Sequence, residues 1–150
     1  MDKVLIRNYN ELVAPDDEVY ITGDFSIKTQ QHKGYLEGIC QKLNGRKHLI
    51  AGNHDVDKYT IYAGSRGIGF FAVHYPVHFV EEFVLCHDPA LSQADRTRPF
   101  VGGHIHDLFL KQKNFLNVGV DLWDFKPVSI DQVRECFKDD LDENGRMKIK

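Results

Sequence analysis

Apolar residues recur at helical spacing in two stretches near the N-terminus. In residues 1–13, one face of a predicted helix carries the apolar set Val4, Leu5, Tyr9, Leu12 and Val13. Pro15 ends this helix, because proline disfavours helical backbone at the residue before it. A second helix is predicted from about residue 30 to residue 43, where Asn44 and Gly45 stop it.

Between and after these helices the chain alternates short apolar runs with glycine, histidine or acidic residues. Five runs are interpreted as strands: 18–22, 47–51, 83–86, 100–101 and 115–118. Strands that alternate with helices predict a mixed α/β fold, and ligand sites in such folds collect beyond the carboxyl ends of strands. The polar groups that follow these runs are therefore expected to converge if the strands are neighbours.

The C-terminal part of the chain predicts one more helix. Ser129 and Gln132 have the spacing of a capping box, which opens a helix to about Phe137, and the charged tail 139–150 follows it. The chain contains no internal repeat and no long Pro/Gly-rich linker. We therefore expect residues 1–150 to form a single domain.

Composition and charge narrow the classes of partner. A chain of 150 residues fits one domain, which buries about two-thirds of its unfolded surface. The net charge of −3 argues against a nucleic-acid partner and permits a small phosphorylated substrate. No apolar stretch approaches the roughly 18 residues of a membrane span, and no signal peptide opens the chain, so no membrane partner is expected. Three separated cysteines predict reduced thiols in a cytoplasmic protein: Cys40, Cys86 and Cys136.

Histidine is the unusual component, with eight residues. His104 and His106 stand two apart in an extended segment, so both rings can reach one small volume. Without a metal, two convergent imidazoles repel when protonated and lack partners when neutral and buried, so metal ligation is favoured. Taken singly, Asp24 is typical of a turn, and His87 is typical of a satisfied core histidine.

The other histidines divide between one unusual run and ordinary positions. Asn53, His54 and Asp55 follow an apolar strand in immediate succession, which favours function over a simple turn. His74 and His78 flank an Xaa-Pro turn and are expected to be exposed there. His32 and His48 are expected at the surface or beside a helix.

Taken together, the polar groups form an ordered set: Gly23-Asp24, Gly52-Asn53-His54-Asp55, His87 and Gly103-His104-Ile105-His106. This set resembles the signature of the calcineurin-like metallophosphoesterase superfamily, which runs D-x-H, G-D, G-N-H-D/E, H and G-H-x-H. The match covers most of the chain, and residues 117–121 and 127–129 also look like the small bacterial and phage-type members. The resemblance implies an α+β fold in which two packed mixed sheets are flanked by helices in a four-layer sandwich, with a dinuclear metal centre at the strand ends.

The resemblance also implies a ligand set. Asp24 would bridge both metals, Asn53, His87 and His104 would complete one metal site, and His106 would bind the other. Amide oxygen and imidazole nitrogen ligands suit Mn²⁺, Fe, Zn²⁺ or Ni²⁺.

The implied activity is that of a metal-dependent phosphoesterase, a hydrolase acting on a small phosphomonoester or phosphodiester. The reaction is attack of a metal-bound hydroxide on phosphorus. His54 would face the phosphate, stabilising charge or protonating the leaving oxygen, and Asp55 would orient its ring.

One departure from the family changes these expectations. No histidine of the chain has an Asp two positions earlier, so the D-x-H motif and the strand before it have no counterpart in this sequence. Two explanations stay open: a start site assigned too late, or a natural truncation. The second metal site then keeps only Asp24 and His106, with Asp107 and Asp121 as nearby substitutes. We expect one tightly bound metal, impaired hydrolysis, and a homo-oligomer formed through the sheet edge that the missing strand leaves open.

Two other classes of function stay open. A non-catalytic metal-binding protein that retains the phosphoesterase fold is favoured by the missing motif. The retained His54 and Asp55 favour an enzyme, because a structural metal needs neither residue. A histidine-rich α/β domain without a metal is the third alternative.

Overall fold

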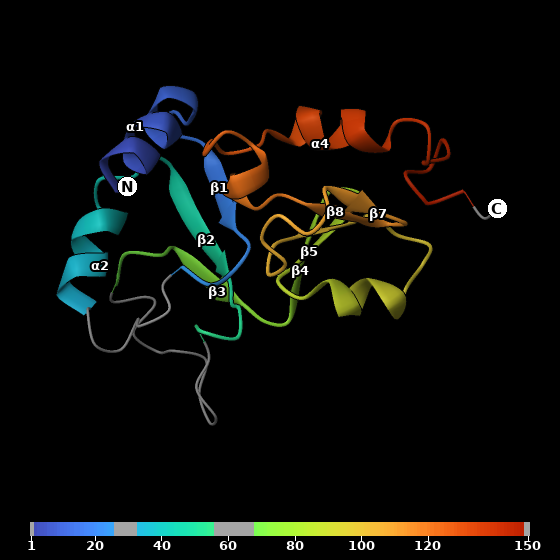
Figure 1. Cartoon of the computed structure of the whole chain (residues 1–150), viewed down its shortest axis with the longest axis horizontal. Coiled ribbons are helices and arrows are strands. Elements are labelled where there is room, and N and C mark those ends of the chain that lie inside the picture. Colours follow the sequence, from blue (N-terminus) through green and yellow to red (C-terminus); the bar gives the residue numbers. More distant parts are fainter. Residues whose placement is uncertain (1, 26–32, 56–67, 149–150) are drawn as a thin grey trace.

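The computed structural model describes residues 2–25, 33–55 and 68–148 (Figure 1). Its helices are α1 (Asp2–Leu12), α2 (Lys33–Cys40) and α4 (Ile130–Phe137), with the 3-10 helices η1 (Pro89–Gln93) and η2 (Val120–Leu122). The strands are β1 (Glu18–Ile21), β2 (Arg46–Ile50), β3 (Ala72–His74), β4 (Val77–Val80), β5 (Phe83–Cys86), β6 (Phe100–Gly102), β7 (Lys111–Gln112) and β8 (Phe115–Asn117).

These strands form two sheets. The smaller sheet has the order β1-β2-β3, and both of its strand pairs are parallel. The larger sheet has the order β4-β5-β6-β8-β7, with a parallel centre and an antiparallel strand at each edge. In Figure 1, α1 and α2 lie beside the smaller sheet and α4 lies along the larger one. The predicted α+β fold of two sheets flanked by helices is confirmed, although the described strands of the smaller sheet are parallel rather than mixed.

Strand β2 explains why the smaller sheet is buried on both faces. Successive side chains of a strand point to opposite faces. Leu49 packs with α2 in one cluster of buried residues: Leu36, Cys40, Ile68 and Phe70. Ile50 points the other way and packs with the larger sheet and α4 in a second cluster: Phe83, Leu85, Val101, Leu116, Val133 and Phe137. Burial of each such aliphatic or aromatic side chain contributes about 1.5–3 kcal/mol.

The larger sheet is covered in the same way. All four residues of β5 are buried, and alternate ones face opposite sides. Val84 and Cys86 pack with Phe100 and Phe115 on the face away from the second cluster. A strand buried on both faces carries few polar side chains, so its first polar residue stands where the strand ends, which here is His87.

The elements confirm most of the predicted pattern. The described strands β1, β2, β5, β6 and β8 match the five predicted runs to within a residue or so, and α1 ends at Leu12. The capping box before α4 is present, because the Ser129 hydroxyl accepts from the Gln132 amide at 3.2 Å and the Gln132 side chain accepts from the Ser129 amide at 2.9 Å. Helix α2 lies within the predicted range, and the predicted start at residues 30–32 lies outside the described residues.

Strands β3, β4 and β7 were not predicted. Each has four residues or fewer, and β3 and β4 carry histidines among their apolar residues. Such short segments become strands because a neighbour supplies their hydrogen bonds, and the sequence does not contain that information locally. Within the described residues, no helix combines the length and the apolar character needed to cross a membrane.

Candidate metal centre

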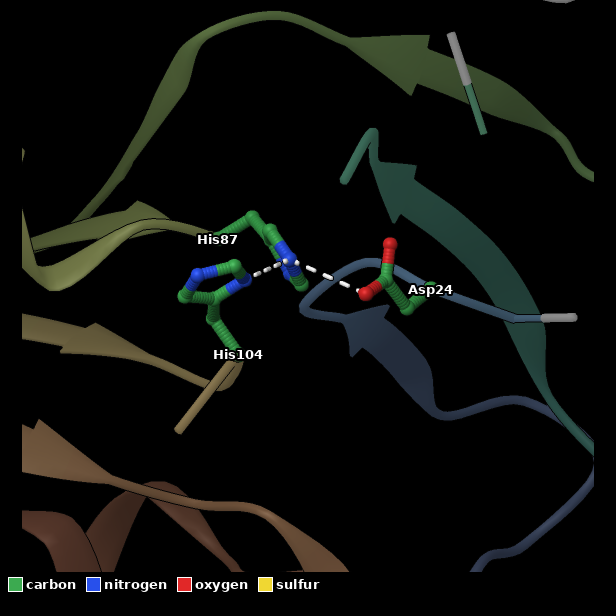
Figure 2. A group of neighbouring side chains, drawn as sticks. All are labelled: Asp24, His87 and His104. Atoms are coloured by element: carbon green, nitrogen blue, oxygen red, sulfur yellow. Dashed lines mark hydrogen bonds and ion pairs between the residues drawn. The ribbon is translucent and has the colours of Figure 1, made fainter. Parts of the chain in front are cut away.

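The predicted ligands lie at the carboxyl ends of strands from both sheets. Asp24 follows β1 and Asn53 follows β2 in the smaller sheet, whereas His87 follows β5 and His104 follows β6 in the larger one. Figure 2 shows Asp24 facing His87 and His104. Ligand atoms of these three residues all lie within 4.8 Å of one another, and they are the one group of His, Cys, Asp or Glu with this geometry among the described residues.

His87 is the centre of the arrangement. Its ring is buried, with 5% of the residue exposed. Nδ1 lies 2.8 Å from the carbonyl oxygen of Thr22. A carbonyl only accepts hydrogen bonds, so the proton of the neutral ring belongs on Nδ1. Nε2 then carries a lone pair that points into the space between the two sheets.

Three polar atoms surround that lone pair. His87 Nε2 lies 2.9 Å from Asn53 Oδ1, 2.9 Å from His104 Nδ1 and 3.2 Å from Asp24 Oδ2. Asn53 Oδ1 and the ionised carboxylate of Asp24 are also acceptors. A single proton on either histidine ring can form hydrogen bonds with only some of these acceptor atoms. A cation at the point where the lone pairs converge satisfies all of it.

The donor set therefore fits a metal ion. It offers two imidazole nitrogens, an amide oxygen and a carboxylate oxygen, which is a set for borderline divalent transition metals such as Mn²⁺, Fe²⁺, Zn²⁺ or Ni²⁺. The Thr22 carbonyl, which holds the outer nitrogen of His87, is the kind of partner that fixes the tautomer of a ligating histidine. Sequence reasoning missed Thr22, because a backbone carbonyl leaves no signal in residue identity.

Asp55 connects the two loops that carry Asp24 and Asn53. Its side chain is buried, with 2% of the residue exposed. One oxygen accepts from the amides of Asp24 at 2.6 Å and Gly52 at 3.0 Å, and the other accepts from the Phe25 amide at 3.2 Å. Burial raises the pKa of this carboxyl, and the three backbone hydrogen bonds oppose the rise. Asp55 thus positions the backbone beneath the centre, and its predicted contact with the His54 ring stays a prediction.

Two glycines permit the close approach of the loops. A Cβ on Gly52 would overlap the carboxylate of Asp24, and a Cβ on Gly23 would overlap the ring of His87. Gly23 also has a φ of +90°, which glycine adopts at little cost. These glycines explain why Gly-Asp and Gly-Asn pairs stand where they do.

Some of the predicted site residues have a strained backbone. Asp24, His104 and His106 have φ values of 52°, 72° and 48°, in the left-handed region that non-glycine residues rarely adopt. Each such residue costs on the order of 1 kcal/mol or more and persists where the surroundings impose it. Glu81, Lys113, Asp124 and Phe125 also have a positive φ elsewhere in the described residues, so these values fix the backbone at Asp24 and His104 and do not by themselves mark a functional centre.

The remaining predicted residues lie differently. His54 is exposed, and its backbone amide donates to Asp24 Oδ1 at 2.9 Å, which fixes the carboxylate that faces His87. His106 does not join the convergent group: its side chain is 83% exposed, and its Nδ1 lies 3.8 Å from Asp121 Oδ2. The structure thus brings together Asp24, Asn53, His87 and His104, and leaves His106 outside them.

The expectation for three other histidines was wrong. His48 is buried rather than at the surface, and His74 and His78 are half-buried rather than exposed in a turn. The three rings contact one another away from the candidate centre. The alternation of side chains along β2 was the signal that could have predicted the burial of His48. His48 stands two residues before the buried Ile50, so both side chains lie on the same face of the sheet.

Comparison with known proteins adds relatives of this fold. No known protein-family profile matches the chain. The crystal structure of AQ665, a protein of unknown function from Aquifex aeolicus, matches with a TM-score of 0.68 over 90% of this chain and 84% of that chain, at 23% sequence identity. At this identity the likeness concerns the fold alone.

The sequence also has a more similar relative. The uncharacterized protein MJ1445 from Methanocaldococcus jannaschii is 33% identical over 144 residues, which cover 89% of this chain and 73% of that protein. Identity at this level extends through most of the domain that carries the candidate centre. The chain therefore belongs to the same family as the archaeal protein MJ1445.

Proposed function

We propose that this protein is a metal-dependent phosphoesterase that hydrolyses a small phosphomonoester or phosphodiester. The observation that carries the proposal is the convergence on His87 Nε2 of Asn53 Oδ1, His104 Nδ1 and Asp24 Oδ2. These are the residues that the resemblance to calcineurin-like metallophosphoesterases nominates for one metal site. The resemblance rests on residue order along the chain, and the convergence rests on distances in space.

The roles follow from the positions of the side chains. Asp24, Asn53, His87 and His104 would hold the metal, which supplies Lewis acidity toward a phosphate oxygen and lowers the pKa of water. The Thr22 carbonyl keeps the proton of His87 on Nδ1, away from the metal. The exposed His54 lies beside the Asp24 carboxylate and would act on the phosphate or on the leaving oxygen.

Metal stoichiometry is part of the proposal. Four residues converge on one position, whereas His106 faces Asp121 at the surface. We therefore expect one tightly held metal per chain and a weaker second site to which Asp24, His106 and Asp121 would contribute. Turnover limited by the second metal should then rise with added Mn²⁺.

A non-catalytic metal-binding protein is the second candidate function. The observation that favours it is the separation of His106 from the convergent group. A single metal held by four protein ligands resembles a structural site, in which no open position is kept for a substrate. Under this alternative the metal stabilises the junction of the two sheets.

Hydrolysis of bis-p-nitrophenyl phosphate with added Mn²⁺ tests the proposal. We expect His54→Ala to lower turnover by about 100-fold or more, because a general acid contributes 10²–10⁴-fold. Metal counted by mass spectrometry should stay unchanged in this variant. His78→Phe is the matched control: it also removes a histidine, lies outside the candidate centre, and should retain both metal and turnover near neutral pH.

The possible outcomes separate the candidates. Bound metal without hydrolysis in the unaltered chain supports the non-catalytic alternative. Equal turnover with and without His54 removes His54 from the mechanism. Two tightly held metals per chain would contradict the one-metal expectation.

The proposal also includes a compartment and a substrate class. The three cysteines are free, and Cys40 and Cys86 are buried, as expected of a protein in the reducing cytoplasm. Burial raises the pKa of the Cys86 thiol to about 12, so this thiol is not a reactive nucleophile. The net charge of −3 favours a small phosphorylated substrate over a long nucleic acid.

A further inference from the structure

A second group of titratable side chains lies apart from the candidate metal centre. We call it the histidine stack; it consists of Tyr20, His48, His74 and His78, one from each of the strands β1 to β4. Tyr20 stacks on His48 with ring centroids 4.7 Å apart, and His74 stacks on His78 at 3.7 Å. His48 and His74 lie nearly coplanar and side by side, with ring centroids 5.4 Å apart, and Tyr20 lies 5.6 Å from His78, so the four rings form one closed group.

Hydrogen bonds order the protons within the stack. His48 Nε2 lies 2.5 Å from the carboxylate of Glu18, and His48 Nδ1 lies 3.1 Å from His74 Nε2. A carboxylate only accepts, so a neutral His48 carries its proton on Nε2 and accepts at Nδ1. His74 then donates from Nε2. The chain of donors runs from His74 through His48 to Glu18, and it is complete when both rings are neutral.

The stack is not arranged as a metal site. The nitrogens of His48 are engaged with His74 and Glu18, and His78 presents its ring face to His74, so the ring nitrogens of the stack do not point toward a common position. Among the described residues, the metal-compatible group is Asp24, His87 and His104, and no residue of the stack belongs to it. The short approach of His48 and His74 is instead that of a hydrogen bond between the two rings.

The histidine stack lies where the two sheets meet. Strand β3 is an edge of the smaller sheet and β4 is an edge of the larger one, and the two follow each other along the chain. His78 from β4 therefore contacts His74 and Tyr20 across the junction of the two sheets. His48 is 8% exposed, and Tyr20 packs against the cluster of buried residues between the sheets. The stack thus connects the two sheets where their edge strands β3 and β4 follow each other.

Strand β3 is also tied to the candidate metal centre. The carbonyl of His74 accepts from the amide of Ala51 at 2.9 Å. Ala51 precedes Gly52 and Asn53, and Gly52 packs on Asp24. Displacement of β3 at His74 would remove this hydrogen bond and release the loop that carries Asn53.

Protonation would disturb the stack for two reasons. A proton added to His74 or His78 places a positive charge against a stacked ring at van der Waals distance, and a second proton adds repulsion between like charges. Burial lowers the pKa of His74, and His78 and His48 lower it further; burial and His48 lower the pKa of His78. Glu18 is the negative charge beside the stack, and its carboxylate also forms an ion pair with Arg46 at 2.8 Å. Tyr20 contributes a neutral hydroxyl.

We propose that the histidine stack is a proton-sensitive contact between the two sheets, closed when His74 and His78 are neutral and opened at acid pH, and that its opening releases the Asn53 loop through loss of the Ala51–His74 hydrogen bond. The sign follows from linkage: a histidine whose folded pKa lies below the unfolded value binds more protons when unfolded. The stabilisation is therefore complete above the unfolded value of about 6.5 and is lost as the pH falls toward the lowered folded values.

Amide hydrogen exchange tests this contact in the metal-free chain. Between about pH 7.5 and about pH 5, and after correction for the chemical exchange rate, we expect protection at the Ala51 amide and in β3 and β4 to fall by about tenfold or more. The amides of β6 and β8 should lose much less. In His78→Phe, which keeps a ring in the stack and removes its proton site, the loss at Ala51 should shrink several-fold. Tyr20→Phe keeps every titrating histidine and should behave like the unaltered chain.

Two results would overturn the proposal. One is an equal loss of protection in both sheets, which would indicate general acid destabilisation. The other is an unchanged pH response at Ala51 in His78→Phe, which would exclude the contact of His78 with His74 as the source of the effect. If the substitution prevents folding, a proton NMR titration of the unaltered chain decides instead: His74 and His78 must titrate below about pH 6.5 together with the β3 amides, and a normal titration would contradict the proposal.

Discussion

At the scale of single residues, the chemistry of this protein depends on which atom of His87 carries a proton. The Thr22 carbonyl accepts a hydrogen bond from the protonated Nδ1, and Nε2 faces Asn53 Oδ1 and Asp24 Oδ2. Two oxygen acceptors around an unprotonated nitrogen are unfavourable unless a cation lies between them. The same atoms in a purely structural role would show a donor opposite each acceptor.

Removal of the Asn53 amide should therefore weaken metal binding. We expect Asn53→Ala to lower Mn²⁺ affinity by about 10–100-fold or more, the loss that follows even from removing an outer partner of a metal ligand. Isothermal titration calorimetry measures this affinity directly. Asn144→Ala, the same change in an exposed turn near the C-terminus, should leave it unaltered. Equal affinity in the two variants would exclude Asn53 as a ligand.

Asp55 should matter for stability more than for chemistry. Its carboxylate accepts from the amides of Asp24, Phe25 and Gly52. Asp55→Asn replaces one acceptor oxygen by an amide donor that faces backbone donors, so we expect a loss of about 1–3 kcal/mol in the free energy of unfolding. Urea denaturation of the metal-free chain measures it. Asp16→Asn, at an exposed position, should change stability little, and an equal effect of both substitutions would contradict the role of Asp55.

At the scale of elements, local sequence signals and sheet packing contribute differently. The capping box at Ser129 involves residues three apart, so the sequence alone predicts it and the structure contains it. Strands β3 and β4 have no such local signal, because Val73 and Phe79 gain strand structure only by pairing with β2 and β5. For the same reason the burial of His48 could not be read from its neighbours in sequence.

Helix α4 should depend measurably on its cap. Its buried residues Val133 and Phe137 pack on the larger sheet, so fraying of the first turn weakens that contact. We expect Ser129→Ala to cost about 1 kcal/mol in the free energy of unfolding. Urea denaturation monitored by circular dichroism measures this cost. Ser129→Thr keeps the hydroxyl acceptor and should retain most of the stability, and an equal loss in both variants would exclude the cap as the cause.

At the scale of the whole molecule, the two sheets meet where both the candidate metal centre and the histidine stack are built. Each group draws residues from the smaller and the larger sheet. A bound metal and a change in the protonation state of the stack would therefore act on the same junction. This explains how a pH-dependent change at the β3 edge would be felt at Asn53.

The open edges of the sheets bear on assembly. Strand β1 stands at the edge of the smaller sheet, and it is parallel to β2 with no further described strand beside it. An unpaired edge presents backbone donors and acceptors to another chain. We expect the protein to self-associate through this edge, with a mass in light scattering that is a multiple of 17.3 kDa. Protection of the β1 amides should rise with concentration, and a 17.3 kDa species at every concentration would contradict the expectation.

The sequence by itself determined the features that depend on near neighbours. These are the existence of the three described α-helices, the capping box, the strands that precede Asp24, Asn53, His87 and His104, and the order of these residues along the chain. Each follows from backbone sterics or from side-chain alternation over a few positions. The order of these residues also nominated the candidate ligands, through its resemblance to the metallophosphoesterase signature.

Only the tertiary structure decided what these residues do together. The convergence of Asp24, Asn53 and His104 on His87 Nε2, the separation of His106 and the assembly of Tyr20 with three histidines depend on how two sheets pack. Packing fixes distances between residues far apart in sequence, through many weak contacts that no short motif encodes. The physical reason is that hydrogen bonding and metal binding require atoms within about 3 Å of each other, a separation that residue order alone does not determine.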